Sequence, residues 1–164
     1  MNITPEKLDE LIRIVHLAGV EIIKIYKKKV TKKYKSDNTP VTNADIRAND
    51  IICKGLKLHF PEISIVSEEQ VKKGKATKKF WLVDPLDGTK EFLKGNGEFT
   101  VNIGLIENKK PVFGIIYMPT KNKLYFTKDK KSYFSKLSKK GRLTNIRKIK
   151  FKKRNKNIAI LSRS

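Results

Sequence analysis

The segment FWLVDPLDGTKEF, residues 80–92, restricts what this chain can fold into more than any other stretch. Its first four residues, ending at Val83, are apolar and predict a buried strand. We expect the strand to stop at Asp84, because Pro85 fixes the backbone of the turn that follows. Gly88 allows the backbone to come close to a ligand. The segment therefore predicts a buried strand that ends in an acidic turn.

Two carboxylates, those of Asp84 and Asp87, stand three positions apart at this predicted strand end. Both can point at one cation, and an oxygen cluster of this kind suits a hard divalent ion such as Mg²⁺. If a helix begins after Gly88, its first amides offer a site for an anion. The alternative is a purely structural turn, since Asp-Pro and Asp-Gly are common loop dipeptides. The rest of the sequence has to decide between these two interpretations.

Residues 80–92 resemble the signature of the lithium-sensitive, Mg²⁺-dependent phosphatase superfamily that includes inositol monophosphatase. The ending Thr-Lys-Glu-Phe, residues 89–92, resembles the 3'(2'),5'-bisphosphate nucleotidases of the CysQ type. Inositol monophosphatases usually have Thr-Thr-Asn-Phe at this place. Further matches fall at residues 40–45, 66–69 and 96–103. The four matches keep the order and spacing of the family, and the resemblance extends along nearly all 164 residues.

The resemblance implies a metal site with two or three Mg²⁺ ions and inhibition by lithium. Its ligands would be the carboxylates of Glu68, Asp84 and Asp87, together with the carbonyl oxygen of Leu86. Glu68 would bind the metal, and Glu69 would lie outside the ligand shell. Read from the residues alone, adjacent acids at a strand end are often only solvated.

The resemblance also implies catalytic and substrate-binding roles. Glu68 and a Thr89–Asp45 pair would orient and deprotonate the attacking water. The backbone amides of Gly88 and Thr89 would hold phosphate oxygens. The residues expected to contact the substrate are Glu68, Leu86, Asp87, Gly88 and Thr89.

Asp45 also has an interpretation that needs no catalysis. Thr42 and Asp45 have the spacing of a capping box at the start of a helix, although Asp is shorter than the usual Glu or Gln. The matched motif favours a catalytic carboxylate next to the Thr89 hydroxyl, and one residue can serve both purposes.

Hydrophobic periodicity predicts an α/β protein, an α+β layered sandwich of helices on a sheet. Two amphipathic helices are expected over residues 4–26 and 42–60. The expected strands are residues 30–34, 63–66, 80–83, 99–106, 112–118, 123–127 and 131–135. From residue 99 onward they form an antiparallel meander whose apolar face packs against the two helices. Residues 141–154 are basic and poorly patterned, with an alternating strand around Ile146 as one interpretation.

We expect residues 1–164 to form one N-terminal α+β domain of an inositol monophosphatase-like, sugar-phosphatase-like fold, with the C-terminal α/β half absent. In the family that half carries a Trp-Asp motif whose Asp is a further metal ligand, whereas Trp81 is the only tryptophan here. Such a chain should be weak or inactive alone, and a complementing C-terminal half is an expected partner.

The net charge of +22, with 33% charged residues, allows three kinds of anionic partner: nucleic acid, a membrane surface or a small substrate. The lysines are scattered along the chain and no nucleic-acid fold signature accompanies them, so nucleic acid is disfavoured. We interpret the charge as a solvated surface that also attracts a phosphorylated nucleotide substrate. Peripheral association with an anionic membrane surface is a further interpretation.

Cys53 is the only cysteine, which excludes an intrachain disulfide and fits a reducing compartment. No apolar run is long enough to span a membrane, and the N-terminus lacks the basic start and apolar core of a signal peptide. The expected location is the cytoplasm, with the inner face of the membrane as the place of any peripheral association.

The sequence thus predicts a Mg²⁺-dependent phosphomonoesterase that resembles the nucleotidases converting adenosine 3',5'-bisphosphate to AMP and phosphate. The alternative among enzymes is an inositol-1-monophosphatase or a fructose-1,6-bisphosphatase-like sugar phosphatase, against which the Lys90-Glu91-Phe92 ending argues. The alternative from another class is a non-catalytic basic fragment that binds anions or nucleic acid.

Overall fold

The computed structural model describes residues 3–28, 32–34, 40–69 and 77–150. Its helices are α1 (Pro5–Tyr26), α2 (Asn43–His59) and α3 (Thr89–Lys94). Its strands are β1 (Lys32–Tyr34), β2 (Pro40–Thr42), β3 (Ser64–Ser67), β4 (Lys79–Asp87), β5 (Thr100–Glu107), β6 (Lys110–Met118), β7 (Lys123–Lys128), β8 (Lys131–Leu137) and β9 (Leu143–Lys148).

The two long helices begin where the sequence provides hydrogen-bonding caps. α1 follows Thr4, whose hydroxyl accepts a hydrogen bond from the Lys7 amide at 3.3 Å, and Pro5 occupies the first turn. α2 follows Thr42, and the predicted capping box with Asp45 is present. Cys53 is buried on α2, as its apolar surroundings in the sequence predicted. Both predicted helices are therefore confirmed within a residue of their expected ends.

A seven-stranded sheet runs in the order β3-β4-β5-β6-β7-β8-β9. β3 and β4 are parallel, and every later neighbouring pair is antiparallel. The predicted meander is confirmed, and the strand expected around Ile146 is present as β9. The short strand β2, which pairs with β1, was missed because three residues carry no usable hydrophobic period.

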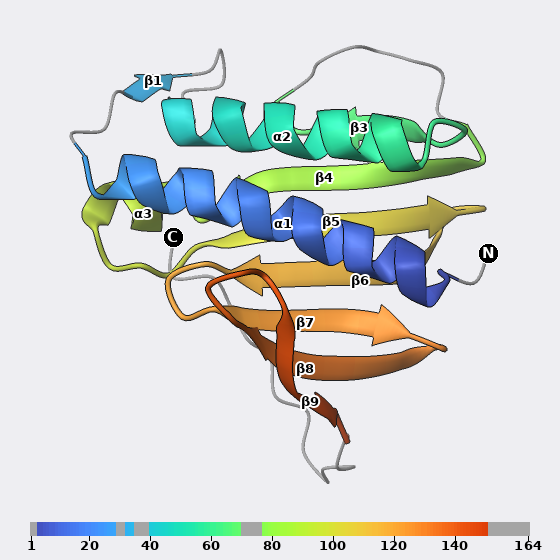
Figure 1. Cartoon of the computed structure of the whole chain (residues 1–164). Helices are drawn as coiled ribbons and strands as arrows, with labels where there is room; N and C mark the ends of the chain where they lie inside the picture. Colours follow the sequence, from blue (N-terminus) through green and yellow to red (C-terminus); the bar gives the residue numbers. More distant parts are fainter. Residues whose placement is uncertain (1–2, 29–31, 35–39, 70–76, 151–164) are drawn as a thin grey trace, which may run out of the picture.

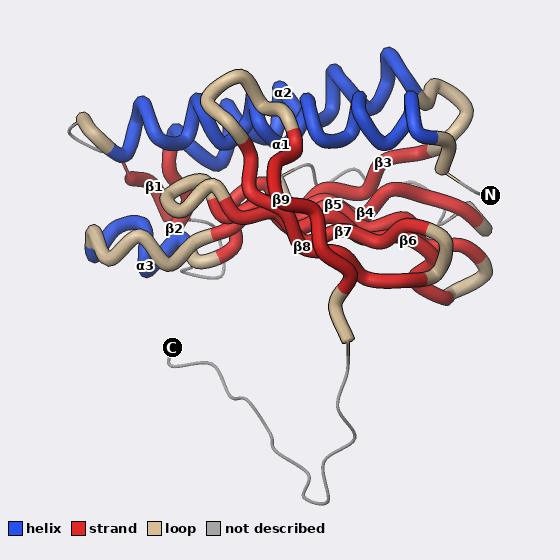
Figure 2. The backbone as a smooth tube through the Cα atoms, turned by 60° about the horizontal axis from the view of Figure 1, so that its bottom comes forward, coloured by secondary structure: helices blue, strands red, loops and turns tan. Residues whose placement is uncertain are grey.

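The α1 and α2 helices lie side by side on one face of the sheet (Figures 1 and 2). The core lies between these layers, and Trp81 at its centre is completely buried between Phe60 and Phe113. The opposite face of the sheet has no described helix over it (Figure 2). Among the described residues, no helix is both long and apolar enough to cross a lipid bilayer.

Candidate active site at the carboxyl ends of β3 and β4

The strand β4 does not stop at Asp84, as the sequence analysis expected, but continues to Asp87. Asp84 pairs with Asn102 on β5 and Asp87 pairs with Thr100, so two residues of β4 lie opposite one residue of β5. This is a β-bulge, and Pro85 is tolerated within it because a bulge leaves a residue outside the ladder. The strand therefore ends at Asp87, beyond the residues 80–83 that the sequence predicted.

The bulge places both aspartates on the same face of the sheet. In a regular strand, residues three apart point to opposite faces. Here Asp84 is paired with Asn102 and Asp87 with Thr100. These two β5 residues are two positions apart and therefore point to the same face, so the extra residue in β4 brings both aspartates to that face. The Asp87 Oδ2 atom accepts a hydrogen bond from Asn102 Nδ2 at 3.0 Å, in agreement with this register. The irregularity thus allows Asp84 and Asp87 to act together.

Glu68 reaches the same place from the neighbouring strand. The parallel register pairs Ser67 with Val83, and the Glu68 amide donates to the Val83 carbonyl at 3.1 Å. Glu68 therefore follows the end of β3 directly beside Asp84. Burial, together with the nearby carboxylates of Glu68 and Asp87, raises the pKa of Asp84 to about 7. The structure brings all three predicted carboxylates into one electrostatically coupled group.

The donor set suits a hard cation, although no closed ligand shell is assembled. Within residues 3–28, 32–34, 40–69 and 77–150, no three His, Cys, Asp or Glu side chains are arranged to hold a metal ion as they stand. The Oδ1 atom of Asp84, however, is buried and has no hydrogen-bond partner. A buried carboxylate oxygen of this kind is costly unless something positive meets it. The all-oxygen group fits Mg²⁺ by chemistry, and the ligand roles of Glu68, Asp84, Leu86 and Asp87 stay a prediction.

The turn between β4 and α3 depends on Gly88. This residue has φ +94°, and a Cβ atom built on it would lie 2.9 Å from the carbonyl oxygen of Glu98. Gly88 also caps α3, which begins at Thr89 as the sequence analysis allowed. The amides of Gly88 and Thr89 therefore lie at a turn that only glycine accommodates without strain.

We expect Gly88→Ala to destabilise the fold by ~3 kcal/mol, because it combines an unfavourable φ with a backbone clash. Gly95→Ala is the matched control, since Gly95 also has a positive φ of +76° but its Cβ would meet only the Tyr26 hydroxyl, at 4.0 Å. Gly95→Ala should lower the free energy of unfolding by only ~1 kcal/mol. Urea unfolding followed by circular dichroism measures both, and equal losses would show that the Glu98 carbonyl moves away freely.

Asp45 connects the start of α2 to this turn. Its Oδ1 atom accepts a hydrogen bond from the Thr89 hydroxyl at 3.1 Å, and its Oδ2 atom accepts from the backbone and hydroxyl of Thr42. Burial raises the pKa of Asp45, and the hydrogen bonds from Thr42 and Thr89 oppose this effect. The predicted Thr89–Asp45 contact and the capping box are therefore both present in one side chain. The Thr89 hydroxyl also contacts the Leu86 carbonyl at 3.2 Å.

Sequence reasoning missed the residues that hold these groups in place. Asn102 positions Asp87 from β5. The Ser67 hydroxyl donates to Asn49 Oδ1 at 2.6 Å, and this buried bond fastens the end of β3, next to Glu68, to α2. The polar alternation of β5 and the family match over residues 96–103 hinted at Asn102. For Asn49 no sequence signal existed, because a single Asn on a helix is ordinarily a solvated surface residue.

A cavity of about 340 Å³ opens beside the turn. We call it the acidic cavity, because Asp87, Glu91 and Glu98 line it with Gly88, Thr100, Met118 and Lys121. Its carboxylates repel an uncompensated phosphate, so an anionic ligand would need a cation beside it. That a cation and a phosphate meet at this turn therefore stays a prediction.

Comparisons with known proteins identify the family and the fold of this chain. A sequence profile described as "Inositol monophosphatase family" matches residues 5–162. The 3'(2'),5'-bisphosphate nucleotidase CysQ of Buchnera aphidicola subsp. Acyrthosiphon pisum is 50% identical over 129 residues, which cover 76% of this chain and 49% of that protein. The CysQ nucleotidase of Escherichia coli (strain K12) is 42% identical over 131 residues, covering 77% and 53%. The chain spans about half the length of these curated relatives.

Solved structures show the same fold. The crystal structure of CysQ from Bacteroides thetaiotaomicron, a bacterial member of the inositol monophosphatase family, has a TM-score of 0.65 and 39% identity, covering 77% of this chain and 48% of that one. The extragenic suppressor protein SuhB of Bartonella henselae has a TM-score of 0.71 and 28% identity, covering 77% and 51%. The predicted resemblance and the predicted fold are both confirmed, and the chain belongs to the inositol monophosphatase family.

Proposed function

We propose that this chain provides the catalytic turn of a Mg²⁺-dependent 3'(2'),5'-bisphosphate nucleotidase that hydrolyses adenosine 3',5'-bisphosphate to AMP and phosphate. The observation that carries the proposal is the strand register, which sets Glu68 beside Asp84 and turns Asp84 and Asp87 to one face next to the Gly88 turn. The identity of 50% to a CysQ nucleotidase supports the nucleotide substrate over inositol or fructose phosphates.

The carboxylates of Glu68, Asp84 and Asp87 and the carbonyl of Leu86 would hold two or three Mg²⁺ ions. Magnesium supplies charge neutralisation at the phosphate and lowers the pKa of water, so that hydroxide becomes available near neutral pH. The unpartnered Oδ1 atom of Asp84 supports this assignment. Inhibition by lithium is part of the same proposal.

The protein's own groups would orient the water and the phosphate. The Thr89 hydroxyl donates its hydrogen toward Asp45 and the Leu86 carbonyl, which leaves its lone pairs free to accept a hydrogen bond from a water. Asp45, whose pKa is raised by burial, is suited to receive a proton through Thr89, and Glu68 would help to orient the same water. The amides of Gly88 and Thr89 would hold phosphate oxygens, and Glu68, Leu86 and Asp87 would complete the contacts.

We propose further that residues 1–164 are the N-terminal domain of this fold and that a complementing half completes the site. The face of the sheet that no described helix covers supports this proposal. Leu82 is 48% exposed and Ile116 is 45% exposed there, in a family whose relatives are about twice as long. In the strand register Leu82 is paired with the exposed Val66, and Ile116 with the exposed Tyr125. Exposed apolar groups of this kind often mark a surface that another protein segment covers.

We also propose that the protein works in the cytoplasm. The single buried thiol of Cys53 supports a reducing compartment. The net charge of +22 supports attraction of anionic nucleotides and allows peripheral association with an anionic membrane surface.

The test is a substrate comparison with the chain alone and with the chain joined to the part of the Buchnera relative that lies outside the matched 129 residues. Phosphate release is measured with adenosine 3',5'-bisphosphate, inositol 1-phosphate and fructose 1,6-bisphosphate, with and without Mg²⁺. We expect the joined form to prefer the nucleotide by roughly a hundredfold and to require Mg²⁺, because a site built for polar groups rejects ligands that lack them. The chain alone should be weak.

Three results would contradict the proposal. Preference for inositol 1-phosphate would make the protein a sugar phosphatase. Release that is equally fast without divalent cations would remove the metal from the reaction. Tight, salt-sensitive RNA binding without any response to Mg²⁺ would favour the non-catalytic basic fragment instead.

A further inference from the structure

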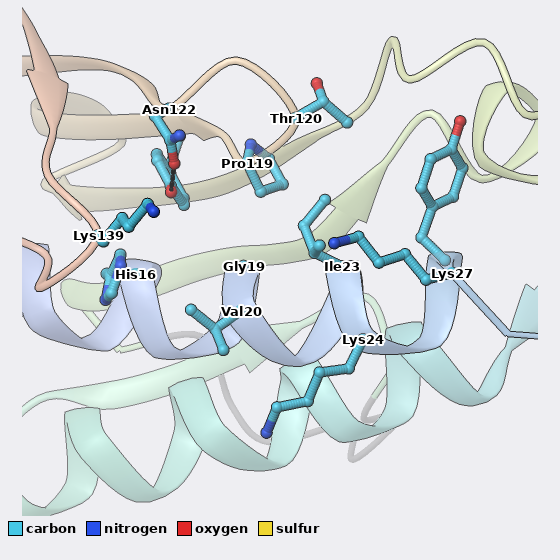
Figure 3. Close-up of a pocket in the computed structure, with 12 residues that line it drawn as sticks. His16, Gly19, Val20, Ile23, Lys24, Lys27, Pro119, Thr120, Asn122 and Lys139 are labelled. Atoms are coloured by element: carbon cyan, nitrogen blue, oxygen red, sulfur yellow. Dashed lines mark hydrogen bonds between the residues drawn. The ribbon is translucent and has the colours of Figure 1, made fainter.

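A second cavity, of about 640 Å³, lies between α1 and the β6–β7 turn, residues 119–122 (Figure 3). We call it the α1 cavity. Its volume falls within the range of about 300–1,000 Å³ that is typical of small-molecule sites. The proposed nucleotidase reaction uses none of its residues, so the α1 cavity requires its own explanation.

The charge of the α1 cavity is opposite to that of the acidic cavity. Its cationic lining side chains are Lys24, Lys27 and Lys139, and none of its described lining residues is acidic. In Figure 3, Lys27 and Lys139 extend toward the cavity from opposite ends, whereas Lys24 turns away from it. Lys24 is paired with Glu21 at 3.1 Å, so the two other lysines provide most of the unneutralised charge. Such a cavity attracts an anion.

Apolar residues form part of the lining of the α1 cavity. Gly19 leaves room for the Tyr117 ring to lie against the helix, since a Cβ atom there would come within 2.4 Å of Tyr117 Cε1. Ile23, Tyr26 and Pro119 add further apolar surface. Tyr117 itself is buried, so the apolar surface open to the body of a ligand is that of Ile23 and Tyr26, which are half-buried.

Hydrogen-bonding groups also face the α1 cavity. The Tyr117 hydroxyl is bonded to Asn122 Oδ1 at 3.0 Å, which orients the Asn122 amide and leaves its NH₂ group able to donate to a ligand. Thr120 donates to the Gly97 carbonyl at 2.8 Å, and this bond holds the β6–β7 turn in place. The polar groups are therefore preorganised by the fold.

The same turn separates the two cavities. Pro119, Thr120 and Asn122 line the α1 cavity, whereas Lys121 lines the acidic cavity. The α1 cavity is thus separate from the acidic cavity, although residues of the same turn line both.

We propose that the α1 cavity binds a small phosphorylated molecule with a flat apolar body, such as a nucleotide. The phosphate contacts Lys27 or Lys139 and the amide of Asn122, and the flat body lies against Ile23 and Tyr26, which are half-buried. Neither group requires a divalent cation, because the lysines supply the positive charge. This site is independent of the proposed reaction at Asp84 and Asp87.

The test measures binding of AMP to the chain by amide NMR in EDTA, so that no metal-dependent phosphate site contributes. We expect signals of Gly19, Thr120 and Asn122 to shift. The double variant Lys27→Gln with Lys139→Gln should bind AMP about tenfold more weakly. Adenosine and inorganic phosphate, each lacking one half of the recognised chemistry, should also bind about tenfold more weakly than AMP.

The control is the double variant Lys54→Gln with Lys128→Gln, which removes the same charge from exposed positions that do not line the α1 cavity. Its affinity for AMP should change less than about twofold. Equal losses in both double variants would show that the net charge of +22 attracts AMP without a site, and would overturn the proposal. So would shifts confined to residues 87–89, or phosphate binding as tight as that of AMP.

Discussion

We expect Asp84→Asn to raise the free energy of unfolding by ~2 kcal/mol at pH 8 in the absence of divalent cations. The reason is the raised pKa of about 7, which arises from burial and from the charges of Glu68 and Asp87. Above pH 7 the folded protein holds an ionised Asp84 at a cost that the unfolded chain does not have. As the pH falls through 7 toward 4, Asp84 becomes protonated in the fold, and the gain from Asn should disappear.

The same substitution should abolish the response to Mg²⁺. If Asp84 is a ligand, Mg²⁺ at a hundred times its Kd stabilises the original chain by about 2.7 kcal/mol through mass action, and the variant receives none of this. In the joined form with the other half, Asp84→Asn should reduce phosphate release by roughly a hundredfold or more. Thermal and urea unfolding at pH 5, 7 and 8, with Mg²⁺ and with EDTA, measure the first two effects.

The control for Asp84→Asn is Asp50→Asn, an exposed carboxylate on α2. Its stability should change by less than ~0.5 kcal/mol at every pH, with the Mg²⁺ response intact. If Asp84→Asn destabilised the protein at pH 8 and kept the Mg²⁺ response, the cluster of Glu68, Asp84 and Asp87 would be structural.

Trp81→Ala should destabilise the fold by 3–5 kcal/mol, on the order of the cost of deleting a buried aromatic side chain. Trp81 is fully buried, and its ring meets those of Phe60 and Phe113 edge-on, with centroid separations of 5.1 and 6.2 Å. It therefore joins β4 and β6 to the residue that caps the end of α2. Because domains are stable by only about 5–15 kcal/mol, the variant should be largely unfolded well below the temperature at which the original chain melts. Circular dichroism measures this without relying on tryptophan fluorescence.

Trp81→Phe keeps the prediction testable if Trp81→Ala fails to fold. The Nε1 atom of Trp81 is buried without a hydrogen-bond partner, and Phe removes this unsatisfied donor while leaving an aromatic ring. Trp81→Phe should therefore lower the free energy of unfolding by no more than ~1.5 kcal/mol. The small cavity that Phe leaves is destabilising, and removal of the unsatisfied N–H group partly compensates for it. If Trp81→Phe destabilised the fold as much as Trp81→Ala, the indole N–H group would have a hydrogen-bond partner, and packing alone would not explain the role of Trp81.

The sequence by itself determined the helices, the meander and the identity of the acidic turn. These features depend on contacts between residues close in the chain. The Thr4 and Thr42 caps bond groups within three residues, and the buried stripe of α1 repeats at the period of the helix. The turn at Gly88 could be predicted for the same reason, because a positive φ depends on one residue and its immediate neighbours.

The tertiary structure alone decided how the site is assembled. The sequence indicated a strand ending at Asp84, but pairing with β5 carries β4 on to Asp87 through a bulge, and only this extra residue turns both aspartates to one face. Strand register likewise set Glu68 beside Asp84, and Asn102 beside Asp87. Register arises from packing between distant segments, which no local pattern encodes. The α1 cavity shows the same limit, because its two inward lysines lie more than a hundred residues apart in the chain.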